Sequence, residues 1–281
     1  MTEAEWNTQC RHCSRTVRRV LRGTVNEVPM WLLLIAVVAA IVGLVLLLVW
    51  LVRRFVPGVS EGFDAEVASQ MLGVVAALFG LLLAFIIVIA YQNYGDTQGR
   101  VSDEADALAA IVRDSGAFPQ PDRDRVRRAV GAYVQTVVNE EWSLMHEGRD
   151  SARAWATVDT MYEALQLVEP RSMRARAFYD DAVRQLNTAL DARRNRLDDA
   201  AGGLPWVIVV LLLVGSVVIL GYAVLVGSRS FGFHAIGAGA TALVVGLSLV
   251  VLVGLTYPFS GDLAIDQAPF RSGALAQFFV P

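Results

Sequence analysis

An uncharged run of 21 residues, from Met71 to Tyr91, constrains the fold of this chain most. A helix needs roughly 20 apolar residues to cross the hydrocarbon core of a bilayer, and only helices and closed barrels satisfy their backbone hydrogen bonds there. We therefore expect a membrane-spanning helix near residues 69–92. The sequence after Tyr91 runs on into a charged helical region, so this stretch is the expected joint between the membrane and the cytosol.

Three further apolar segments have the length of membrane spans, near residues 30–52, 204–226 and 234–256. The whole chain is 55% hydrophobic, with a mean hydropathy of +0.48, which is typical of a membrane protein. Its net charge of −3 gives no electrostatic basis for nucleic-acid binding. The predicted surroundings are thus a lipid bilayer, with four spans.

The arginines indicate which way the protein faces. All 24 basic residues are arginine, and five of them lie before the first span, while the loop after it holds only Arg53 and Arg54 and the loop before span four only Arg229. Cytoplasmic segments are enriched in Lys and Arg, so both termini and the middle of the chain should be cytoplasmic. The absence of lysine and the richness in Ala, Val and Gly suggest a bacterium with a GC-rich genome, and hence the inner membrane.

The middle segment, 93–203, shows helical spacing of apolar residues and no alternating strand pattern. We expect helices near 100–114, 122–147, 151–169 and 171–199, packed as an antiparallel cytoplasmic bundle inserted between spans two and three. The prediction is an all-α polytopic protein. Its parts are a basic arm (1–29), spans one and two (30–92), the helical domain (93–203), spans three and four (204–257) and a cytoplasmic tail (258–281) whose Phe270, Phe278 and Phe279 should dock on an apolar surface.

Span two is sorted by side-chain size. Small residues recur every three or four positions at Gly73, Ala77, Gly80 and Ala84, and span four has a similar stripe containing Gly239 and Gly246. Such stripes let helix backbones approach closely, either within a subunit or between subunits of a homo-oligomer. The other side of span two is bulky, so it faces either lipid or a pore; its candidate pore-lining residues are Val75, Phe79, Leu82, Ile86 and Asn93.

Charged side chains gather at both ends of the helical domain, near the points where the chain leaves span two and enters span three. The acidic group includes Glu104, which the macrodipole favours near a helix N-terminus, so simple solvation is one explanation, and a ring of these residues at the mouth of an oligomeric pore is the other. Arg193, Arg194 and Arg196 precede span three. They could pair with Glu141 and its neighbour on a facing helix, attract anionic lipid, or concentrate anions near a pore mouth.

No motif for enzymatic chemistry occurs, and neither a metal nor another cofactor is expected. The spans hold no acidic residue, so proton coupling is unsupported. Cys10 and Cys13 flank His12 in a C-x-x-C, but a second pair of ligands at zinc-site spacing is missing. These observations argue against an enzyme and against a metal transporter.

Several short motifs together resemble the bestrophin-like family of bacterial membrane proteins. They are FGLLLAF at 79–85, Glu141-Trp142, RRNRL at 193–197, Leu204-Pro205 and PFSG at 258–261, and the resemblance covers about residues 30–270. It implies a relation to bestrophins, which are pentameric anion channels whose second span lines the pore with an apolar neck. Phe79, Leu82, Leu83 and Ile86 would be the neck candidates. The acidic calcium clasp of bestrophins has no match beyond the isolated Asp262 and Asp266, so calcium gating is not implied.

The leading hypothesis is therefore an oligomeric ion channel, anion-conducting by resemblance, with an inorganic ion as its permeant and its pore along span two. The alternative is a non-conducting scaffold or sensor whose cytoplasmic bundle binds a partner. Neither the ion, the gating stimulus nor the subunit number follows from the residues.

Overall fold

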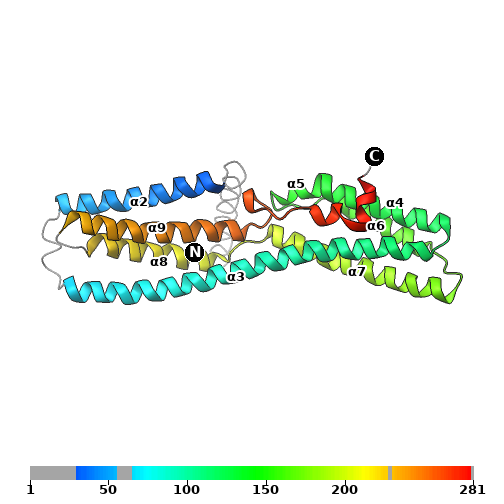
Figure 1. Cartoon of the computed structure of the whole chain (residues 1–281), viewed down its shortest axis with the longest axis horizontal. Helices are drawn as coiled ribbons and strands as arrows, with labels where there is room; N and C mark the ends of the chain where they lie inside the picture. The colour runs from blue at the N-terminus through cyan, green and yellow to red at the C-terminus, as the bar shows by residue number, and fades with distance from the viewer. Residues whose placement is uncertain (1–29, 56–64, 227–229, 280–281) are drawn as a thin grey trace, which may run out of the picture. The chain divides into compact units, whose positions relative to one another are not determined.

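The structure, a computed structural model, describes residues 30–55, 65–226 and 230–279. These residues form helices and contain no strand (Figure 1). The basic arm, with Cys10, His12 and Cys13, lies outside the described residues. The described chain divides into two compact units: unit 1 comprises the residues up to Gln92 together with 203–256 and 261–263, and unit 2 comprises 93–202, 257–260 and the residues from Ala264 onward.

Unit 1 contains the apolar helices. They are α2 (Met30–Phe55), the first part of α3 (Ala65–Asp114), α8 (Trp206–Leu225) and α9 (Phe231–Thr256), followed by the short turn η3 (Gly261–Leu263). Each of these four helices contains a stretch that is long and apolar enough to cross a membrane. Large apolar side chains such as Trp31, Phe85 and Val217 are exposed on them, as expected for surfaces that meet lipid.

Close packing inside unit 1 depends on small residues of α9. A Cβ added to Gly246 would lie 3.4 Å from side-chain atoms of Val38 and Ile41 on α2, so the two helices approach closely there. Ala238 and Ala242 are buried against Val45 and Val49 in the same seam. The stripe predicted on span four thus packs within the chain.

The helix α3 is a single element of 50 residues, about 75 Å long at 1.5 Å per residue. The separate helix expected near 100–114 is continuous with span two, because no proline interrupts the segment. Gly95 and Gly99 each cost only about 1 kcal/mol in a helix, which is too little to end it. The helix ends just before η1 (Ser115–Ala117), ahead of Pro119.

Unit 2 is a helical bundle around one core. Beside the second part of α3 it contains α4 (Gln120–Thr136), the π-helical turn η2 (Val137–Glu141), α5 (Trp142–Met145), α6 (Ala152–Gln166) and α7 (Met173–Ala201). Ser151 and Ser172 cap α6 and α7 by accepting hydrogen bonds from the amides of Ala154 and Ala175. The π turn divides the helix expected at 122–147. The helix that starts after Ser151 ends at Gln166 rather than near Pro170.

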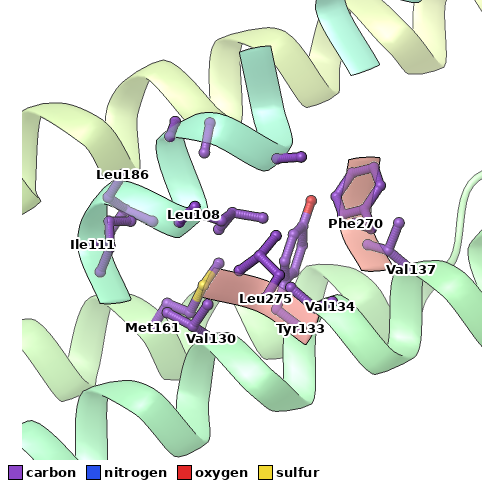
Figure 2. Close-up of a cluster of buried hydrophobic side chains, with 14 of the residues drawn as sticks. Leu108, Ile111, Val130, Tyr133, Val134, Val137, Met161, Leu186, Phe270 and Leu275 are labelled. Atoms are coloured by element: carbon purple, nitrogen blue, oxygen red, sulfur yellow. The ribbon is translucent and has the colours of Figure 1, made fainter. Parts of the chain in front are cut away.

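The C-terminal segment completes the core of unit 2. Its 3₁₀ turns η4 (Ala268–Arg271) and η5 (Gly273–Phe278) bury Phe270 and Leu275 completely, beside Tyr133 and Val134 of α4 (Figure 2). The ring of Phe278 takes the space where Gly131 lacks a side chain, since an added Cβ would approach it to 2.7 Å. The expected docking of the tail phenylalanines on an apolar surface is confirmed.

Candidate functional site

The side of α3 that packs within unit 1 is the bulky one. Phe79, Leu83, Ile86 and Ala90 recur at helical spacing and are buried in a cluster with residues of α8 and α9: Leu212, Ile219, Val245 and Leu252. The Phe79 ring fills the space beside Gly215 of α8, where an added Cβ would come within 2.3 Å of a ring carbon. A glycine on α8 thus receives an aromatic ring of the α3 span.

The small side of α3 has no close neighbour among the residues that the structure describes. Gly73, Ala77, Gly80 and Ala84 are exposed, and a Cβ added to either glycine would meet no atom within 4 Å. On α9, by contrast, Gly239 faces Leu46 and Gly246 faces Val38 and Ile41. The two predicted stripes therefore differ: the one on α9 is used within the subunit, and the one on α3 is left open.

This arrangement separates the five predicted pore-lining residues. Phe79 and Ile86 are buried, Leu82 packs partly against the same cluster, and only Val75 and Asn93 are exposed. The physical reason is the Phe79–Gly215 contact, which turns the bulky side of α3 toward α8. In a single chain, the buried pair therefore has no free surface to offer an ion.

The side of α3 turned away from α8 presents different residues. Leu81 and Val88 lie about 200° and 180° around the helix from Phe79, and they are 57% and 51% exposed. Sequence reasoning missed both, because every face of this span is apolar. Gly215 was the available signal, since a glycine in an apolar span often marks the approach of a neighbouring helix.

A second cluster of interest is an ion-pair network in the core of unit 2. Arg196 on α7 binds Glu104 on α3 with two nearly parallel hydrogen bonds, Nε to Oε2 at 2.7 Å and Nη2 to Oε1 at 3.0 Å. Arg193, one turn earlier, binds Glu141 at 3.2 and 2.6 Å in the same bidentate manner. A further hydrogen bond of 3.0 Å from Arg196 Nη2 to Glu141 Oε2 joins the two pairs. All four side chains are 0% exposed.

Aromatic rings surround these guanidinium groups. The Arg193 guanidinium carbon lies 4.0 Å from the ring centroid of Trp155, and that of Arg196 lies 5.6 Å from Trp142 and 5.8 Å from Phe270. Such cation–π contacts offset part of the cost of removing the cations from water. Tyr133 completes the cluster by donating its hydroxyl hydrogen to Glu104.

The π-helical turn η2 brings Glu141 into this network. A π turn inserts one extra residue into a helix and changes the direction of the side chains that follow, and such turns occur frequently at functional sites. Glu141, the last residue of η2, is fully buried and also accepts a 3.3 Å hydrogen bond from the Ser151 amide. Its neighbour Glu140 is partly exposed and accepts a hydrogen bond from the Ser151 hydroxyl.

The network is electrically balanced, with two carboxylates and two guanidinium groups. Burial alone would raise the pKa of Glu141, but the hydrogen bonds and charges of Arg193 and Arg196 outweigh it and hold the pKa below its usual value. Burial and the neighbouring Glu104 together raise the pKa of Tyr133 well above its usual value, so this hydroxyl keeps its proton. Glu141 therefore stays ionised at neutral pH, and the network ties α3, η2 and α7 together.

Four of the five charged residues singled out from the sequence meet in this cluster. Glu104 is buried rather than solvated, because Arg196 and Tyr133 satisfy its carboxylate. Arg193 and Arg196 pair with Glu141, which was one of the alternatives, whereas Arg194 is exposed and pairs with Asp191 on its own helix. Within the described ranges, no three potential metal-ligating side chains come together.

Four membrane-length apolar helices and a helical bundle, joined by one 50-residue helix, define an all-helical membrane protein. More particularly, the chain belongs to the bestrophin-like family, because residues 39–270 match the family model described as Bestrophin-like domain. This family includes ion channels. No curated protein matches the chain significantly in sequence.

Solved structures share its fold. A bacterial bestrophin homologue from Klebsiella pneumoniae, carrying a point substitution, has a TM-score of 0.67 at 12% identity, covering 88% of this chain and 99% of its own. A second variant of that homologue has a TM-score of 0.65 at 13% identity with the same coverage. A crystal structure described only as a membrane protein variant has a TM-score of 0.67 at 12% identity, covering 86% of this chain and 97% of its own.

Proposed function

We propose that this protein is a homo-oligomeric ion channel of a bacterial inner membrane, with its pore along the membrane part of α3. The observation that carries the proposal is the incomplete packing of that helix. One side of it is buried against α8 and α9, while the described part of the chain leaves its small-residue stripe and the side bearing Leu81 and Val88 open. Such a helix suits a position where copies of the chain meet.

The small stripe on α3 supplies the contact between copies. Without side chains larger than methyl at Gly73, Ala77, Gly80 and Ala84, two helices can approach closely in a bilayer. When a neighbouring copy packs against this stripe, the side of α3 opposite α8 faces the central axis of the ring of subunits. Leu81 and Val88 then form apolar constrictions, which can control ion passage by excluding water.

Val75 and Asn93 are exposed, but both lie about 40° around α3 from Phe79, on the side that packs toward α8. In this arrangement they do not face the axis of the pore. Anion preference is supported by the likeness to bestrophins. Phe79, Leu82 and Ile86 take a supporting role in this arrangement by fixing the rotation of α3 against α8.

The orientation that we propose places unit 2, both termini and the C-terminal tail in the cytoplasm, with the loops 56–64 and 227–229 outside. It rests on the arginine distribution. In a background carrying Cys10→Ser and Cys13→Ser, cysteines at Ser60 or Ser228 should react with a membrane-impermeant thiol reagent in intact cells. Cysteines at the exposed Ser143 or Ser172 should react only after lysis, and their labelling in intact cells would reverse the orientation.

Electrical recording of the purified protein in a planar bilayer tests conduction and selectivity together. Under a potassium chloride gradient, an anion channel gives a reversal potential of the sign expected for chloride, and a cation channel gives the opposite sign. Folded, oligomeric protein that stays silent would instead favour the scaffold or sensor, in which the helical bundle of unit 2 binds a partner.

A further inference from the structure

A cleft of about 430 Å³ lies in unit 2 where the last turn of α3, the turn η1 and the first turn of α7 meet. The α3 and α7 ends that border it are neighbours in Figure 1, and η1 contacts α7 directly. Its size falls within the range of small-molecule sites. The cleft is lined by Arg113, Gly116, Ala117, Ser172, Arg174, Ala175 and Phe178.

Two guanidinium groups reach this cleft from different elements. Arg113 comes from α3 and Arg174 from α7, and among the described residues neither forms an ion pair with a carboxylate. The adjacent Asp114 is buried, and its carboxyl group lies beside that of Asp181. Arginine binds phosphate oxygens through paired N–H donors, so two arginines lining one cleft favour a phosphate-bearing ligand.

An aromatic ring lies beside these charges. Phe178 is 36% exposed, and the guanidinium carbon of Arg174 lies 6.0 Å from the centroid of its ring. An aromatic side chain next to a phosphate-binding group provides a stacking surface for a base, because every nucleobase presents a π face. A phosphate alone uses neither the ring nor most of the volume of the cleft.

We propose that this cleft binds a phosphorylated nucleoside, with its phosphates between Arg113 and Arg174 and its base against Phe178. The site lies wholly within unit 2 and uses no residue of the spans. The proposal is therefore independent of ion conduction, and a binding measurement tests it directly.

Gly116 allows the cleft to be blocked without removing a charge. A Cβ built on this glycine meets no atom within 4 Å, so a larger side chain projects into open space. Gly116→Leu should fill part of the cleft and leave the fold intact. Arg174→Glu is the complementary change, and an acidic residue in the first turn of α7 is compatible with the helix dipole.

The test uses purified full-length protein in detergent and ADP as the probe, followed by isothermal titration calorimetry. We expect saturable binding of one ADP per chain, with affinity lowered about tenfold or more in both Arg174→Glu and Gly116→Leu. The matched control is Arg176→Glu, an exposed arginine of the same helix that does not line the cleft, and it should bind ADP as the parent does. Phe178→Leu should weaken ADP but leave glycerol phosphate unchanged.

Three results would overturn the proposal. One is the absence of saturable ADP binding by a parent protein that melts cooperatively. Another is an equal loss in Arg176→Glu, which would indicate attraction to general surface charge. The third is binding of glycerol phosphate as tight as that of ADP, because it would assign the cleft to phosphate esters such as lipid headgroups.

Discussion

Removing one member of the buried ion-pair network should destabilise the protein far more than removing a matched pair. In Glu104→Leu, Arg196 loses two of its three carboxylate hydrogen bonds while remaining buried, and the Tyr133 hydroxyl loses its acceptor. Leaving a buried charge uncompensated costs about 3–5 kcal/mol. At about 2–4 °C per kcal/mol for a chain of this size, the unfolding temperature should fall by about 6–20 °C.

The double variant Glu104→Leu/Arg196→Met removes one charge of each sign. It leaves Arg193 bound to Glu141, so the remaining network is still neutral. Replacing a whole buried ion pair by apolar residues is often close to neutral in stability, so the double variant should melt nearer to the parent than either single variant does.

Melting in detergent, followed by near-ultraviolet circular dichroism, measures all four proteins of this cycle. The argument fails if Glu104→Leu lowers the unfolding temperature by less than about 3 °C, the effect of a surface change. It also fails if the losses of the two single variants add in the double variant, because additivity would mean that the two charges do not interact.

Three further changes probe α3 and the acidic pair of unit 2. Gly80→Leu should leave the subunit folded, since Gly80 has no neighbour among the described residues, but should abolish assembly as measured by size-exclusion chromatography with light scattering, whereas Gly43→Leu on α2 should still assemble. Phe79→Ala should lower the unfolding temperature by emptying the space beside Gly215, where a cavity of this kind costs about 3–5 kcal/mol in water-soluble cores; an unchanged melt would contradict the packing. Burial and the contact with Asp181 raise the pKa of Asp114 from 3.8 to about 6, so the folded chain holds this proton more tightly than the unfolded chain between those pH values. Stability should therefore fall as pH rises through that window, and the melting temperature of Asp114→Asn relative to the parent should increase between pH 4 and pH 7; a constant difference would refute the raised pKa.

The helices and spans were predictable because their signals are local. Uncharged runs longer than 20 residues mark α2, α3, α8 and α9 in the sequence, and the serines that cap α6 and α7 stand at the positions expected for N-caps. The continuity of α3 was harder to predict. A polar stretch with two glycines suggests a joint, although neither glycine is sufficient to end a helix.

The packing of α3 could not be predicted from its own residues. Both Phe79 and Leu81 belong to an entirely apolar span, so periodicity distinguishes small from bulky faces but not inside from outside. The side of α3 that faces inward is set by Gly215, which lies 136 positions after Phe79. Because Gly215 has no side chain, it leaves room for the Phe79 ring. Small residues on α3 suggested packing, and within the chain the packing is made by the opposite side.

The buried charges were unpredictable for a related reason. Glu104 and Arg196 are separated by 92 positions, and each stands in a stretch that is typical of a solvated helix face. The cost of burying these charges is offset only when two guanidinium groups, two carboxylates and several rings come together, and that depends on the tertiary structure. The π turn before Trp142, which directs Glu141 inward, has no signal in a single sequence.

Chloride efflux from liposomes tests most directly whether α3 lines a pore. We expect efflux through the parent protein and faster efflux through Leu81→Ala, because the smaller side chain widens the proposed constriction. The matched control is Leu213→Ala, a leucine of α8 with a similar exposure of 55%, which should conduct as the parent does. The channel account would be contradicted if parent and Leu81→Ala were both folded and oligomeric yet released no chloride, and the pore position would be contradicted if Leu213→Ala raised the efflux equally.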